Sequence, residues 1–149
     1  MREQPHILIV EARFYDDIAD ELVKGATRAL DEAQATYERV SVPGAFEIPA
    51  AIRLAMDAKT DGETRFDGYV ALGCVIRGET THYDYVCGES ARGLQDLALS
   101  HKLAIGYGIL TVENRDQAWA RGAVDRGDKG RAAVDACLAM VGLARRFGG

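Results

Sequence analysis

The chain is poor in the residues that build disulfide frameworks and metal sites. Its cysteines are only three, Cys74, Cys87 and Cys137, and they are widely spaced with no CxxC pair. A disulfide scaffold or zinc site needs a closer pattern, so we interpret them as buried small apolar residues. No two of the three histidines have the spacing of a metal-binding HExxH helix. We therefore expect no metal site.

Long runs of one residue type are also absent. No apolar run approaches the ~20 residues of a membrane span, and no basic block exists. Aspartate plus glutamate number 23 against 18 lysines and arginines, so the formal net charge is −5, which disfavours non-specific nucleic-acid binding. The first apolar run, HILIV, is too short for a signal peptide and ends in Glu11. These features predict a cytoplasmic protein with no membrane or nucleic-acid partner.

What the chain does have is an alternation of short apolar runs and helical stretches. Its 149 residues fit one domain of about 150 residues, so 1–149 is expected to be a single domain. The sequence predicts strands at 6–10, 36–42, 68–72 and 103–110, and helices at 15–33, 46–58, 81–100, 114–121 and 129–147, with a polar loop at 60–66 and a long connection at 73–80.

Strands separated by helices must run parallel, because each return needs a crossover connection. The strands are almost continuously apolar, which is typical of a sheet covered on both faces. The pattern therefore predicts an α/β fold: a three-layer α/β/α sandwich with a four-stranded parallel sheet and flavodoxin-like winding. Ligands in such folds bind beyond the carboxyl ends of the strands, so the segments that follow each strand are expected to carry the ligand-binding residues.

Several common ligand signatures are missing from those segments. No glycine-rich fingerprint follows the first strand, and no GxSxG turn is present. The segment GAVDRGDK lacks the lysine of a phosphate-binding P-loop, because Asp128 follows Gly127. Dinucleotide-dependent and serine-hydrolase classes are therefore excluded, and no cofactor is expected.

Two post-strand segments fit the binding of a flat ring. Phe14 could stack on a planar heterocycle, or it could only cover the end of the first helix. In VPGAFEIP, Pro43 and Pro49 restrict the backbone on either side of Gly44. That turn could present fixed backbone groups to an amide-rich ring, or it could simply join a strand to a helix.

The segment 73–84, GCVIRGETTHYD, is the most informative. It leads into a helix N-terminus, where free N–H groups attract anions. Thr80 and Thr81 could cap that helix and also donate to a phosphate. His82 falls in the first turn, where the helix dipole favours neutral imidazole, so it is either a general acid–base or a structural histidine. Arg121 and Lys129 are either anion ligands or solvated surface cations.

Three segments together resemble the 6,7-dimethyl-8-ribityllumazine synthase family. They are VPGAFEIP at 42–49, LGCVIRGETTHYDYVC at 72–87, and LTVENRDQAWAR at 110–121 followed by Lys129-Gly130. The resemblance extends over nearly the whole chain. It implies condensation of 5-amino-6-(D-ribitylamino)uracil with 3,4-dihydroxy-2-butanone 4-phosphate, the penultimate step of riboflavin biosynthesis, with release of phosphate and water.

The resemblance also implies roles for individual residues. Phe14 would stack on the pyrimidine, and His82 would transfer protons. The ring and ribityl chain would be held by Ala45, Phe46, Glu47, Cys74, Val75 and Ile76. Tyr107 would also belong to the pyrimidine-binding residues, and the butanone phosphate would be held by Glu79, Thr80, Arg121 and Lys129. Tyr107, Arg121 and Lys129 would reach the site from a neighbouring subunit.

Some features depart from the family pattern. Tyr107 stands where phenylalanine or an aliphatic residue is more usual, and AVDRGD at 123–128 replaces the Gly-x-Lys-Ala-Gly-Asn of shell-forming members. Only the short segment MREQP precedes the first strand. These departures favour a pentamer or a decamer over a sixty-subunit icosahedral shell. Separately, the resemblance implies riboflavin synthase as a partner. The alternatives for function are a non-catalytic flavin- or lumazine-binding relative and the archaeal-type riboflavin synthase, which GETTHYDYV disfavours.

Overall fold

A parallel sheet forms the centre of the computed structural model, which describes residues 3–148. Strands β1 (His6–Ala12), β2 (Thr36–Val42), β5 (Gly68–Ile76) and β6 (Ile105–Val112) lie in the order β2-β1-β5-β6. Each neighbouring pair is parallel. Numbered by sheet strands alone, this is the 2-1-3-4 order of flavodoxin-like folds. The predicted fold class is confirmed.

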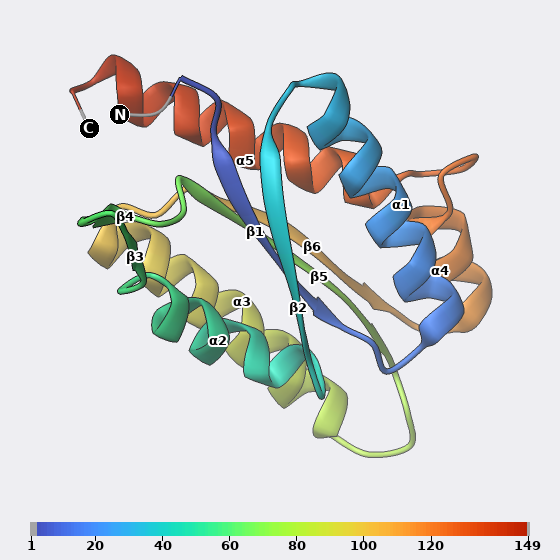
Figure 1. Ribbon diagram of the computed structural model, residues 1–149. Helices are drawn as coiled ribbons and strands as arrows, with labels where there is room; N and C mark the ends of the chain where they lie inside the picture. The colour runs from blue at the N-terminus through green and yellow to red at the C-terminus, as the bar shows by residue number, and fades with distance from the viewer. Residues whose placement is uncertain (1–2, 149) are drawn as a thin grey trace.

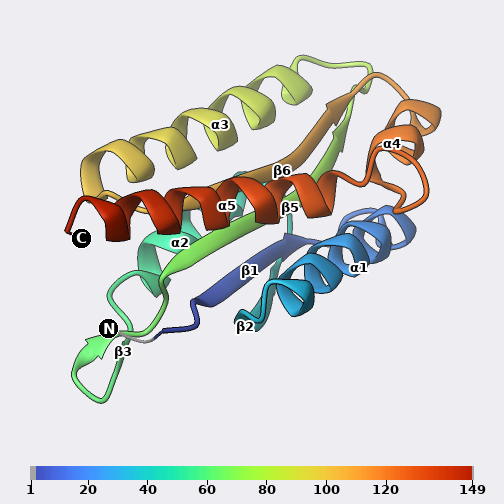
Figure 2. The same cartoon turned by 90° about the horizontal axis from the view of Figure 1, so that it is seen from above.

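Helices cover both faces of the sheet (Figures 1 and 2). One face carries α1 (Asp16–Glu32), α4 (Arg115–Gly122) and α5 (Lys129–Arg146), and the other carries a short 3-10 turn (Ala45–Glu47), α2 (Ile48–Ala55) and α3 (His82–His101). Residues of β1 alternate between the two cores, with Ile7 and Ile9 in one and Leu8 and Val10 in the other. This is the two-residue period of a strand with both faces buried. Within residues 3–148, no helix has the length and apolarity needed to cross a membrane.

Helix α5 packs directly on the backbone of its neighbours. A methyl group placed on Gly106 of β6 would lie 1.9 Å from the carbonyl oxygen of Ala133, and one placed on Gly130 would lie 2.0 Å from that of Leu22 on α1. Backbone atoms cannot move aside as a flexible side chain can. Glycine at these two positions therefore sets how closely α5 approaches the sheet and α1.

Two predicted connections need correction. The 73–80 connection begins late, because Gly73–Ile76 continue β5 and pair in register with Ile109–Val112. The expected polar loop at 60–66 contains a small hairpin, β3 (Lys59–Thr60) and β4 (Glu63–Thr64). Its two central residues both have positive φ, 53° at Asp61 and 81° at Gly62, which is typical of an Asp-Gly type I′ turn.

The close approach of α5 predicts opposite effects for two glycine substitutions. Gly106→Ala should destabilise the protein by roughly 3 kcal/mol, because the added methyl group overlaps backbone. Gly142→Ala is the matched control on α5, where an added methyl group meets nothing within 4 Å. It should stabilise the helix by about 0.5–1 kcal/mol. Urea unfolding at pH 7 measures both values, and equal effects at the two positions would contradict this account of the packing.

Candidate active site

A cavity of about 500 Å³ lies at the carboxyl edge of the sheet. Its wall is built from the β1–α1 loop, the turn after β2, the end of β5 and the first turns of α3. The lining residues are Phe14, Tyr15, Pro43, Gly44, Ala45, Phe46, Glu47, Cys74, Val75, Ile76, His82 and Val86. The structure therefore brings together eight residues expected from the sequence: Phe14, Ala45, Phe46, Glu47, Cys74, Val75, Ile76 and His82.

Two exposed aromatic rings stand at this cavity. Phe14 is 72% exposed and meets Tyr15 edge to face, with ring centroids 5.0 Å apart. Phe46 is 53% exposed and comes from the turn after β2. Both rings are among the residues that line the cavity. Their faces are available to a planar ligand, as the stacking interpretation of Phe14 requires.

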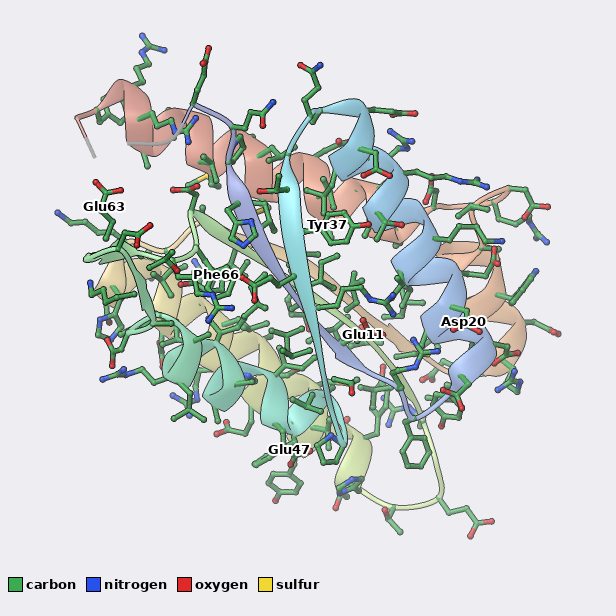
Figure 3. All side chains as sticks on the ribbon, viewed as in Figure 1. Glu11, Asp20, Tyr37, Glu47, Glu63 and Phe66 are labelled. Atoms are coloured by element: carbon green, nitrogen blue, oxygen red, sulfur yellow. The ribbon has the colours of Figure 1, made fainter. Side chains whose placement is uncertain are left out.

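The turn after β2 is tightly constructed. Gly44 is extended, with φ −157°, and the N–H of Glu47 donates to its carbonyl at 3.1 Å. Ala45 is buried, whereas the Glu47 side chain is exposed at the end of β2 (Figure 3). Pro49 lies in the first turn of α2, where a missing N–H costs no helical hydrogen bond. The turn is thus held from both sides, and Pro43–Glu47 line the cavity.

Strand β5 contributes its last three residues, Cys74, Val75 and Ile76, to the lining of the cavity. Val75 and Ile76 are half-buried, and Cys74 is 9% exposed. Burial raises the pKa of the Cys74 thiol to about 11. At neutral pH this residue is a neutral thiol, and it forms a compact, largely apolar part of the wall.

His82 is the first residue of α3 and is exposed at the cavity. Its backbone N–H donates to Thr80 Oγ1 at 3.3 Å. The expected capping is only half right, because Thr81 occupies the N-cap position but its side chain makes no capping hydrogen bond. Thr80 supplies that contact from one residue earlier.

Arg77 fixes the base of the loop that leads to His82. Its Nε donates to Glu113 Oε2 at 2.7 Å, just beyond the end of β6. Its guanidinium lies 4.3 Å from the ring centroid of Tyr83 and 3.6 Å from Asp84, both in the first turn of α3. The ends of two strands and the start of α3 are therefore tied together by one side chain.

The remaining predicted residues do not line this cavity. Glu79 and Thr80 are exposed on the loop between β5 and α3, which projects beyond the strand ends (Figure 1). Tyr107 lies on β6 beside α3, in a separate hollow with Leu94 and Ala91. Arg121 is exposed near the end of α4 and donates to the carbonyl of Gln117 at 3.1 Å. Lys129, also exposed, is the first residue of α5.

Sequence reasoning missed two lining residues, Tyr15 and Val86. Tyr15 adjoins Phe14 in the same post-strand segment, so its place in the sequence could have identified it as a lining residue. Val86 lies one helical turn after His82 and shares its face of α3, as i and i+4 residues do. Among residues 3–148, no cluster of His, Cys, Asp or Glu has the make-up of a metal site.

One charged side chain is buried directly beneath the loop that carries Phe14. Glu11 of β1 is 2% exposed. It accepts hydrogen bonds from Arg39 Nε at 2.7 Å and Arg13 Nη1 at 2.7 Å. Burial alone would raise the pKa of Glu11, but the hydrogen bonds from Arg39 and Arg13 outweigh it and hold this pKa below its usual value.

This fold and site define a class: an α/β/α protein with an aromatic-lined cavity at the carboxyl edge of a parallel sheet and a histidine at a helix start beside it. A family model described as 6,7-dimethyl-8-ribityllumazine synthase matches residues 4–145. The chain belongs to this family, and it is accordingly a transferase of the penultimate step of riboflavin biosynthesis.

Individual relatives agree over nearly their full length. The chain is 61% identical over 143 residues to "6,7-dimethyl-8-ribityllumazine synthase 1" of Rhizobium meliloti, covering 96% of this chain and 94% of the relative. It is 58% identical over 146 residues to the 6,7-dimethyl-8-ribityllumazine synthase of Agrobacterium fabrum, covering 98% and 99%. The relative from Bartonella tribocorum, of the same name, is 55% identical over 148 residues. These names favour the enzyme over a non-catalytic binding relative.

The burial of Cys74 predicts a thiol that reacts slowly with alkylating reagents. Because its pKa is raised to about 11, the thiolate fraction at pH 7.5 should be about a hundredfold below that of an ordinary exposed thiol. Iodoacetamide should therefore alkylate Cys74 at least tenfold more slowly than it alkylates glutathione, and unfolding in urea should remove the difference. Mass spectrometry of the peptide follows the reaction, and a rate equal to that of glutathione would disprove the assignment.

Proposed function

We propose that the cavity at the carboxyl edge is the place where this chain condenses 5-amino-6-(D-ribitylamino)uracil with 3,4-dihydroxy-2-butanone 4-phosphate. The observation that carries the proposal is the meeting of Phe14, Phe46 and His82 around one cavity of about 500 Å³. The amine attacks the ketone and water leaves, giving an imine. Phosphate is eliminated, the second nitrogen closes the ring, and a further water is lost.

This condensation needs no external oxidant or reductant. Its demands are the alignment of an amine with a ketone, which alone can lower a barrier by several kcal/mol, and proton transfer, worth roughly 10²–10⁴-fold. In the proposed arrangement Phe14 stacks on the pyrimidine. Backbone groups of Ala45–Glu47 and Cys74–Ile76 hold the ring and the ribityl chain, and His82 moves protons.

The phosphate is proposed to bind at the other side of His82. Glu79 and Thr80 lie on the loop that precedes α3, and helix starts favour anions. Arg121, Lys129 and Tyr107 do not line the cavity of their own chain. We therefore propose that a neighbouring subunit supplies them. Head-to-tail contacts of this kind form a ring when the rotation between neighbours closes. Among closed assemblies, a pentamer or decamer is favoured because the 123–128 bend departs from the shell-forming pattern.

The proposal includes the setting of the enzyme. Residues 1–149 act as a single lumazine synthase domain, a view supported by one central four-stranded sheet with helices on both faces. A phosphorylated substrate does not cross membranes, which supports a cytoplasmic location. Riboflavin synthase, which consumes the lumazine product, is the proposed partner.

One assay tests the function directly. The purified chain is incubated with the two substrates, and formation of the lumazine is followed by its absorbance. Growth of the product absorbance with both substrates, and not with either alone, is the expected result. Binding of lumazine without turnover would instead favour the non-catalytic relative.

His82→Ala should lower kcat by roughly a hundredfold and should change the KM for the aminouracil by less than about threefold. Some activity should survive, because positioning of the two substrates remains. The matched control is His101→Ala at the opposite, exposed end of α3, which should retain wild-type turnover. Unchanged turnover of His82→Ala would remove this residue from the mechanism.

Arg121→Ala should raise the KM for the butanone phosphate about tenfold or more, because the phosphate loses a charge-assisted pair worth roughly 1.5–3 kcal/mol. Arg121→Lys should recover little, since an ammonium cannot reproduce the two-pronged contact. The control is Arg126→Ala, an exposed arginine in the bend that follows α4. Steady-state kinetics with varied butanone phosphate decide the matter, and an unchanged KM would place the anion site elsewhere.

Sedimentation or light scattering at neutral pH tests the assembly. A pentamer of 16.2 kDa chains should weigh about 81 kDa, and a decamer twice that. A particle near a megadalton would contradict the preference for small assemblies. A monomer that turns over both substrates would contradict the shared site itself.

A further inference from the structure

Glu11 is a charged residue that is buried inside β1, between the apolar residues Val10 and Ala12. It pairs with Ser41 on one side and Leu72 on the other, inside the central strand β1. Burying a carboxylate carries a desolvation cost that its partners often do not exceed, so an apolar residue of similar size would serve stability as well or better. Glu11 therefore needs an explanation other than the stability of the fold.

The first partner of Glu11 leads to Phe14. Arg13 uses its whole guanidinium on three carboxylates: Nη1 donates to Glu11 at 2.7 Å, Nε donates to Asp16 at 3.2 Å, and Nη2 donates to Asp20. Figure 3 shows Glu11 on β1 and Asp20 on α1 on the same flank of the sheet. With Arg13 fixed between β1 and α1, the next residue, Phe14, is held at the cavity.

The second partner leads to the opposite wall. Arg39 of β2 makes two hydrogen bonds to Glu11, from Nε at 2.7 Å and from Nη2 at 3.1 Å. β2 is an edge strand, and it ends at Val42, directly before the Pro43–Glu47 turn. Arg39 thus ties the strand that carries Ala45 and Phe46 to the same buried carboxylate.

We propose that Glu11 is a positioning residue for the aminouracil substrate: its carboxylate, through Arg13 and Arg39, fixes the distance between the Phe14 loop and the Ala45–Phe46 turn. This inference rests on the proposed function. The phosphate side is held separately, because Arg77 anchors the loop before His82 to Glu113 and Asp84. Loss of the Glu11 charge should therefore affect one substrate and leave the other.

The same pair of strands offers a matched control at its other end. Glu38 of β2 stands opposite Leu8 of β1. It accepts hydrogen bonds from Arg65 Nε at 2.9 Å and bonds His6 Nε2 at 2.8 Å. Like Glu11 it is a carboxylate shared by two basic side chains, but none of these residues lines the cavity. Glu38→Gln reports the general effect of removing such a charge from β1–β2.

The experiment compares Glu11→Gln and Glu38→Gln in the full-length enzyme, with both substrates varied. Glu11→Gln should raise the KM for the aminouracil about tenfold, as expected for a displacement of the ring-binding wall by a fraction of an ångström. It should change kcat and the KM for the butanone phosphate by less than about threefold. Glu38→Gln should change none of the three, and Glu11→Asp, which keeps the charge, should recover part of the aminouracil affinity.

If Glu11→Gln does not fold, Arg13→Gln removes the same link from a partly exposed position and should show the same split between the two substrates. Equal rises in both KM values, or a rise no larger than that of Glu38→Gln, would overturn the proposal while the lumazine synthase activity of the wild type stands. A wild-type chain that forms no lumazine would overturn the proposed function, and this inference with it.

Discussion

Parallel strand pairing is the constraint on which the rest of the molecule depends. Because every strand of the sheet runs the same way, every strand ends at the same edge, and a helix must return the chain after each one. Phe14, Phe46 and Cys74 are far apart in sequence, and this arrangement of strand ends brings them together at one cavity. Gly106 of β6 and Gly130 of α5 allow α5 to pack closely on β6 and on α1. Helix α5 thereby covers the face of the sheet opposite to α2 and α3.

The demands of the reaction match the rigidity of this edge. A condensation that relies on alignment gains most when its binding groups belong to fixed backbone. Cys74–Ile76 are still part of β5 and pair with β6, and His82 opens a long helix. The exposed segment between them, 77–81, is anchored at its first residue by Arg77. The structure thus combines a fixed wall with a loop of exposed polar groups beside the histidine.

Much of this could be predicted from the sequence, and the failures have physical causes. The fold class followed from the alternation of apolar runs and helical periodicity, and β2 was predicted with its exact ends. The predicted β5 is too short, because the apolar run alone does not show that pairing with β6 carries the strand through Gly73 to Ile76. The hairpin at Asp61-Gly62 was missed despite a dipeptide that favours a type I′ turn. In the sequence Glu11 only ends an apolar run, because a sequence does not show whether a charged side chain is buried. Only the structure shows Arg13 and Arg39 around it.

The separation of Arg121 and Lys129 from the cavity has a consequence for how activity and assembly relate. In one chain the histidine and the preceding loop are open to water, where an ion pair with phosphate is screened and contributes little. A neighbouring subunit that covers this side would both add cations and exclude solvent, and each effect strengthens the other because charge interactions grow as water is removed. On the proposed assembly the ring-binding wall belongs to each subunit alone, while the anion site exists only between subunits. Dissociation should then weaken binding of the phosphorylated substrate before it weakens binding of the pyrimidine.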